Sequence, residues 1–142
     1  MKILITIPAS HEHVRLVGKA LKGILEDIIE EGDTLFLMEL AACEAVTNSI
    51  KHAYANQQQG NVEMDIEINN SQIIIKVADE GKKLNPELLK RHSFQDTCDL
   101  ASLNEGGRGI PIINNVMDQV DYYSECNKNI LIMKKSITIR NE

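Results

Sequence analysis

The stretch ELAACEAVTNSIKHAYANQQQG, residues 39–60, decides the fold of this chain. It carries a carboxylate, a carboxamide and an imidazole at four-residue steps, at Glu44, Asn48 and His52. Residues four apart in a helix lie on the same face, one turn above the other. The same helix also carries a stripe of small and apolar residues suited to close packing on a sheet: Leu35, Met38, Ala42, Ala45, Ser49 and Ala53. The sequence therefore predicts a core helix that presents three polar groups in a row.

The composition is that of a globular domain with an aliphatic core. The length of 142 residues favours a single domain spanning 1–142, with 43% apolar and 25% charged residues. Aromatic residues make up only 4% of the chain and Trp is absent, so aliphatic side chains must fill the core. Acidic residues outnumber basic ones by 21 to 15. The resulting formal charge of -6 argues against nucleic acid as a partner.

The apolar runs are too short to cross a bilayer, and the opening residues MKILITIPAS lack the apolar segment of a signal peptide. We therefore expect a cytoplasmic protein without a membrane partner. The cysteines, Cys43, Cys98 and Cys126, are odd in number and far apart, which fits neither a disulfide framework nor a CxxC metal pair. We interpret them as reduced thiols.

The periodicity of the chain predicts an α+β fold. Alternating or β-branched runs predict strands over residues 2–7, 62–68, 72–78, 120–124 and 129–136. Apolar residues at helical spacing predict helices over residues 10–32, 33–55 and 110–117. A short helix is also expected over residues 85–90, inside an irregular segment of about 25 residues, the kind that often forms a lid or binding loop. The prediction is a two-layer sandwich, with a mixed, mostly antiparallel sheet and helices on one face.

Three local features point to chemistry, and each has an ordinary structural explanation beside the functional one. Glu44 and Asn48 offer hard oxygen ligands of the type that Mg²⁺ accepts, but such a pair also occurs on plain helix surfaces. Asp79-Glu80-Gly81 follows a strand and forms a turn, in which glycine lets a flat ligand approach the backbone. Gly106-Gly107-Arg108-Gly109 opens a helix, as either a structural cap or an anion site.

The order and spacing of these features carry more information than any one of them. The segments EAVTNSIKHAY, VADEG and EGGRGI follow one another in the order helix, strand end and glycine-rich helix start. Together they resemble the GHKL ATP-binding fold, also called the Bergerat fold, and within it most closely the anti-sigma-factor serine/threonine kinases. The resemblance covers nearly the whole chain.

The resemblance implies specific roles for the residues of the three motifs. Glu44 would act as the catalytic base toward an attacking hydroxyl group, and Asn48 would hold Mg²⁺ beside ATP. Asp79 would bond the adenine amino group, with Gly81 beneath the ring. Gly107 and Gly109 would close on the phosphates, with Arg108 as a further cationic donor, and an ATP lid is expected at about residues 80–108.

The resemblance also implies partners. The expected function is to bind ATP and Mg²⁺, to sequester a sigma factor or similar protein, and to phosphorylate a STAS-type antagonist protein on Ser or Thr. A homodimer through the first helix and its neighbouring strand is expected as well.

The chain departs from the family pattern at one position. Lys83 occupies the place where many relatives carry the second glycine of the strand-end motif. A bulky charged residue there could alter nucleotide affinity or lid movement. Two alternatives therefore stay open: an ATP/ADP-dependent binding module with little or no kinase activity, and a small ATPase acting on water. The role of His52 also stays open between bracing the site and serving it.

Overall fold

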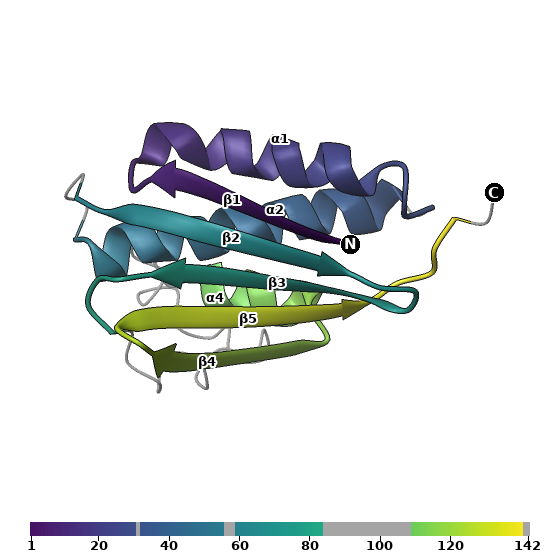
Figure 1. The fold of residues 1–142 in the computed structure, drawn as a ribbon. Helices are drawn as coiled ribbons and strands as arrows, with labels where there is room; N and C mark the ends of the chain where they lie inside the picture. Colours follow the sequence, from purple (N-terminus) through teal and green to yellow (C-terminus); the bar gives the residue numbers. More distant parts are fainter. Residues whose placement is uncertain (31, 56–58, 84–108, 141–142) are drawn as a thin grey trace, which may run out of the picture.

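The computed structural model describes residues 1–30, 32–55, 59–83 and 109–140. Its elements form two layers, with a five-stranded sheet on one side and helices on the other (Figure 1). The strands are β1 (Lys2–Pro8), β2 (Asn61–Ile68), β3 (Gln72–Asp79), β4 (Gln119–Glu125) and β5 (Lys128–Ser136). The helical elements are η1 (His11–His13), α1 (Val14–Leu25), α2 (Gly32–Asn48), the π-helical turn η2 (Ser49–Ala53) and α4 (Gly109–Val116).

The sheet has the order β1-β2-β3-β5-β4, and each pair of neighbouring strands is antiparallel. The register places Asn129 of β5 opposite Asp79 at the end of β3, and opposite Ser124 of β4. Because alternate residues of a strand face the same side, Asn129 points to the helical layer together with Leu131 and Met133. This register brings a polar side chain of β5 to the end of β3.

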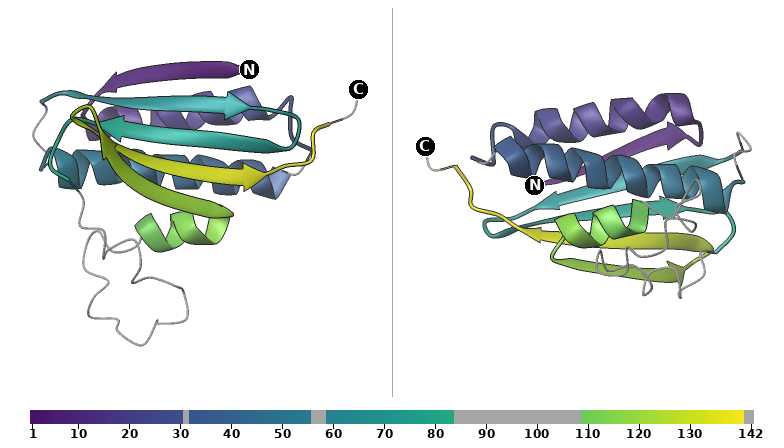
Figure 2. Two further views of the ribbon diagram at one scale, coloured as in Figure 1. Left: turned by 60° about the horizontal axis from the view of Figure 1, so that its bottom comes forward. Right: turned by 180° about the vertical axis from the view of Figure 1, so that it is seen from behind.

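The helices cover one face of the sheet, with α2 between α1 and α4 (Figure 2). Small residues of α2 permit this close packing, since Ala42 and Ala45 are fully buried against the apolar face of the sheet. The contact of α1 with α2 is equally close, because a Cβ added at Gly18 would lie only 2.5 Å from Cys43 Sγ. None of the described helices combines the length and apolarity needed to cross a bilayer.

The predicted fold class and the five predicted strands are confirmed. The predicted end of the first helix near Gly32 is wrong, because α1 ends at Leu25. The chain turns there so that Ile29 can pair with Ile139, a long-range contact that local periodicity does not encode. The second predicted helix is interrupted by η2, where the Tyr54 N–H donates to the Ser49 carbonyl five residues earlier. The short helix predicted over 85–90 lies outside the described residues.

Candidate functional site

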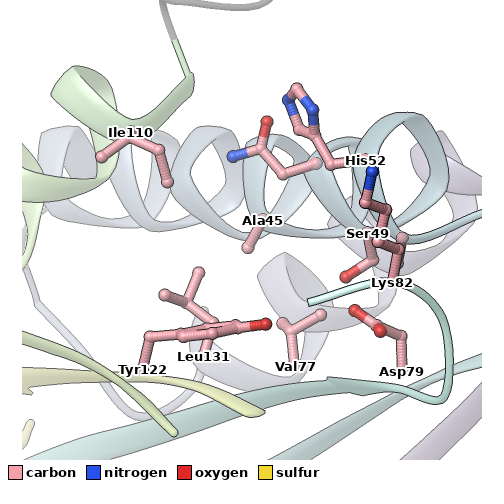
Figure 3. A pocket seen from close by; sticks show the side chains of 11 residues that line it. Ala45, Ser49, His52, Val77, Asp79, Lys82, Ile110, Tyr122 and Leu131 are labelled. Atoms are coloured by element: carbon pink, nitrogen blue, oxygen red, sulfur yellow. The ribbon is translucent and has the colours of Figure 1, made fainter. Parts of the chain in front are cut away.

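A pocket opens between the end of α2 and the sheet (Figure 3). Including its open mouth, it holds about 360 Å³ of empty space. The described residues that line it are Ala45, Asn48, Ser49, His52, Ala53, Val77, Asp79, Lys82, Ile110, Tyr122 and Leu131. Its floor is mostly apolar, with the Asp79 carboxylate and the Tyr122 hydroxyl group as polar groups, while His52 and Lys82 lie farther from the sheet, at the rim. A flat apolar ring with a polar edge suits such a floor.

One end of the site is formed where α4 begins against α2. A Cβ added at Gly109 would lie 2.8 Å from Glu44 Oε2 and 3.1 Å from both amide atoms of Asn48. Gly109, the first residue of α4, therefore lies with its backbone directly against Glu44 and Asn48. These two residues lie on α2, which we call the motif helix. The Asn48 side chain is buried, and its Nδ2 has no hydrogen-bond partner among the described residues. A buried amide without a partner is costly, which favours a ligand at this position.

The other end of the site is built around the buried carboxylate of Asp79, which is 7% exposed. Asn129 Nδ2 donates to Asp79 Oδ1 over 2.9 Å, and the Gly81 N–H donates to the same oxygen over 3.1 Å. Burial raises the pKa of Asp79, while hydrogen bonds from Asn129, Gly81 and Ser49 oppose that increase. The carboxylate is thus held in one orientation, facing the pocket.

The loop after Asp79 is attached to the end of the motif helix. A Cβ added at Gly81 would lie 2.3 Å from the carbonyl oxygen of Ala53, so only glycine fits there. The Lys82 N–H donates to that same carbonyl over 2.8 Å. The Tyr54 hydroxyl accepts from the Glu80 N–H over 2.9 Å and donates to the Asn61 carbonyl over 2.8 Å. Packing and hydrogen bonds therefore join the end of the helix that carries Glu44 and Asn48 to the loop after Asp79.

The structure thus brings four of the predicted site residues to one pocket and its edge: Glu44, Asn48, Asp79 and Gly109. Gly81 packs beside them on Ala53. Residues 84–108, which make up most of the expected lid and include Gly107 and Arg108, lie outside the described residues. Lys83 is exposed and does not belong to the described lining of the pocket.

Sequence reasoning missed Asn129, Ser49 and Tyr54 as parts of the site. Asn129 carried a usable signal, since it is a polar residue at an inward position of a strand that otherwise reads as buried. Ser49 was assigned to the packing stripe, yet its hydroxyl group also serves Asp79. No local pattern indicates the role of Tyr54, because it depends on how two separate loops meet.

The residues present fit a nucleotide and a divalent cation. The pocket offers an apolar floor with one fixed carboxylate, which can accept a hydrogen bond from the amino group of a base. At the other end, the amide oxygen of Asn48 and the carboxylate of Glu44 offer hard ligand atoms next to a helix start, and the unpaired Nδ2 of Asn48 offers a donor to a phosphate oxygen.

Comparisons with known proteins show the family to which the chain belongs. The family model of the histidine kinase-like ATPase domain matches residues 7–135. Serine-protein kinase RsbW of Staphylococcus epidermidis is 34% identical over 140 residues, which cover 95% of this chain and 88% of the relative. Serine-protein kinase RsbW of Staphylococcus aureus strain MSSA476 is 32% identical over the same shares.

Solved structures share the fold at lower identity. A Mycobacterium tuberculosis protein with RsbU and RsbW domains superposes with a TM-score of 0.69 at 15% identity, covering 99% of this chain and 33% of that one. A chain of the SiaB–SiaC complex from Pseudomonas aeruginosa superposes with a TM-score of 0.58 at 14% identity, covering 95% and 89% of the two chains. The family model and the sequence matches confirm the expected resemblance. The chain belongs to the family of histidine kinase-like ATPase domains that includes the RsbW serine-protein kinases.

Proposed function

We propose that this protein is an ATP-dependent protein serine/threonine kinase of the anti-sigma-factor type. The observation that carries the proposal is the meeting of Glu44, Asn48 and Gly109 at one end of a pocket whose other end holds the buried carboxylate of Asp79. A nucleotide bound with its base at Asp79 would direct its phosphates toward Glu44. This is the geometry that transfer to a partner's hydroxyl group requires.

Each end of the pocket then has a distinct task. Asp79 accepts a hydrogen bond from the base, while Asn129 and Gly81 keep its carboxylate in place. Gly109 lets the start of α4 approach the phosphates, and Gly107 and Arg108 are proposed to extend that contact. Glu44 orients the incoming Ser or Thr hydroxyl group and takes its proton as the phosphorus–oxygen bond forms.

Asn48 is the proposed Mg²⁺ ligand. Its Nδ2 is buried without a partner among the described residues, and a half-turn of the amide group would place the oxygen at that position, where it can hold a cation. When bound, Mg²⁺ neutralises phosphate charge. One amide is a weak site, so the cation is expected to bind together with ATP rather than alone.

The relatives suggest the class of partner. The staphylococcal relatives are serine-protein kinases, and the Pseudomonas relative was crystallised in complex with a second protein, SiaC. We propose that the present chain phosphorylates a STAS-type antagonist protein on Ser or Thr and sequesters a sigma factor or similar protein in the cytoplasm. The whole chain would act as one nucleotide-binding domain, with residues 80–108 as its lid.

We also propose a homodimer formed through α1 and β1. β1 is an edge strand of the sheet, and it presents Leu4 with 60% of its surface exposed. The molar mass measured by light scattering tests this assignment, and a mass of one chain at micromolar concentration would contradict it.

Replacement of Glu44 tests the kinase proposal most directly. With purified STAS-type proteins of the source genome as acceptors and labelled ATP, Glu44→Gln is expected to abolish phosphate transfer while ATP affinity stays within about 3-fold. Glu39→Gln is the matched control, because Glu39 lies on the same helix but faces Gly18 of α1. Unchanged transfer by Glu44→Gln would remove Glu44 from the base role. ATP binding by the parent without any transfer would favour the nucleotide-dependent binding module instead.

A further inference from the structure

Tyr122 places a phenol ring on the floor of the pocket, a group to which the proposed function gives no task. The residue lies on β4, and its register partner on β5 is Leu131, which in turn pairs with Val77 on β3. These three side chains form one row across the sheet and line the pocket together. Aliphatic residues alone would make an apolar floor, so the aromatic ring needs an explanation of its own.

The ring of Tyr122 lies along the floor of the pocket. Figure 3 shows the ring edge-on above the strands, with its hydroxyl end toward Val77. Neighbouring strands lie about 4.8 Å apart, so roughly 10 Å separates β4 from β3, and the tyrosine side chain extends across β5 into this space. Because Tyr122 is half-buried and lines the pocket, one face of its ring is available to a flat ligand.

Asp79 and Tyr122 are placed to contact different parts of a bound base. Asp79 follows Val77 by two residues on β3, so both side chains face the helical layer and their Cα atoms lie about 7 Å apart. Tyr122 reaches the same region from two strands away. A base whose amino group bonds the Asp79 carboxylate would therefore extend over Val77 and the ring of Tyr122. The carboxylate meets the edge of the base, and the phenol ring meets its face.

The carboxylate of Asp79 cannot select one base by itself. It accepts a hydrogen bond, and adenine and cytosine both carry an exocyclic amino group that donates one. The two bases differ in the area of their faces, since a purine has two fused rings and a pyrimidine has one. Contact with an apolar aromatic surface stabilises in proportion to the area covered, so the larger base gains more from Tyr122.

We propose that the ring of Tyr122 stacks on the base of the bound nucleotide and makes the site prefer adenine to cytosine. The inference rests on the proposed ATP site and adds a specificity-determining residue to it. Asp79 recognises the amino group, and Tyr122 recognises the extent of the ring system. The preference depends on the face of the ring and does not require the Tyr122 hydroxyl group.

Calorimetric titration with ATP and with CTP, both in Mg²⁺, tests the proposal. Tyr122→Leu is expected to lower the ATP affinity roughly 10-fold and the CTP affinity about 2-fold, since it removes the aromatic face but keeps an apolar floor. Tyr122→Phe keeps the ring and should bind both nucleotides as the parent does. Tyr123→Leu is the matched control, because Tyr123 is 38% exposed and points to the opposite face of the sheet. It should also match the parent.

The ratio of ATP affinity to CTP affinity decides the outcome, and circular dichroism first shows that each variant is folded. Tyr122→Met fills the site with a flexible apolar side chain and should lower the ratio as Tyr122→Leu does. If both aliphatic variants keep the ratio of the parent, the stacking role is overturned while the ATP site stands. An equal fall of the ratio in Tyr122→Phe would assign the effect to the hydroxyl group and would also overturn it. If the parent binds neither nucleotide, the proposed function itself fails.

Discussion

Asn129 on β5 holds Asp79 on β3 in place: its amide nitrogen donates to the Asp79 carboxylate over 2.9 Å and to the Gly81 carbonyl over 2.8 Å. The Ser124 hydroxyl in turn donates to Asn129 Oδ1 over 3.0 Å. One buried amide therefore positions both the carboxylate that is proposed to bond the base and the backbone of Gly81 next to it. The hydrogen bonds run across three strands, so the orientation of Asp79 depends on the register of the sheet.

Replacement of Asn129 by alanine should weaken ATP binding by roughly 10-fold, because Asp79 loses a donor that fixes its orientation. Asn70→Ala is the matched control, since Asn70 lies exposed in the turn between β2 and β3. Calorimetric titration with ATP measures both variants. Equal ATP affinities for Asn129→Ala and Asn70→Ala would contradict the positioning role.

The buried charge of Asp79 should reduce the stability of the free protein. Its pKa is raised in the folded state, so the folded protein binds more protons than the unfolded chain above the ordinary range of Asp, near pH 4. The free energy of unfolding therefore falls as the pH rises through that interval. Asp79→Asn removes this effect and keeps an Oδ1 acceptor for Asn129 and Gly81. We expect it to unfold at a higher urea concentration than the parent at neutral pH, with the difference shrinking at acid pH.

The same substitution should change which base is bound. The amide nitrogen of asparagine donates where the carboxylate accepted, so it opposes the adenine amino group and suits a carbonyl group. We expect a loss of ATP affinity of about 100-fold and a smaller loss for ITP, measured by competition titration. If ATP and ITP lose affinity equally, Asp79 does not contact the base.

Gly109 offers a test of the contact between α4 and the motif helix. Gly109→Ala would place a Cβ 2.8 Å from Glu44 Oε2 and so displace the Glu44 carboxylate, the proposed catalytic base. Phosphate transfer should fall by about 100-fold. Gly23→Ala is the control, because a Cβ there meets nothing within 4 Å on the exposed side of α1. The control should keep full activity and gain up to about 1 kcal/mol of stability. Full activity of Gly109→Ala would show that the close contact of α4 with Glu44 is not needed for phosphate transfer.

Asn48→Ala should lower ATP affinity by roughly 10-fold in Mg²⁺ and leave it unchanged in EDTA. The fold should persist, because Asn48 Nδ2 has no partner to lose among the residues described. Asn115→Ala, on the exposed side of α4, is the control. Titrations of parent and variants with and without Mg²⁺ measure the effect. If the parent protein binds ATP with equal affinity in Mg²⁺ and in EDTA, the assignment of Asn48 as the Mg²⁺ ligand is wrong.

The sequence predicted those parts of the site that depend on local spacing. Glu44 and Asn48 share a helix face because they are four residues apart, and Asp79 ends a strand because a β-branched run precedes it. What it did not predict depends on contacts between distant segments. α1 ends early because Ile29 pairs with Ile139, and Asn129 reaches Asp79 only through the register of β3 with β5. The alternation of the strand would have shown that Asn129 faces inward, but not what it meets there.

The wall of the pocket has a practical consequence for spectroscopy. The chain contains three tyrosines and no tryptophan, so its intrinsic emission comes from tyrosine alone. Among them Tyr122 belongs to the described lining of the pocket, beside Leu131, whereas Tyr54 and Tyr123 do not. An adenine ring in the pocket would lie against Tyr122 and quench a substantial share of this emission. If the proposed nucleotide binds there, tyrosine fluorescence would report occupancy of the site without any attached dye.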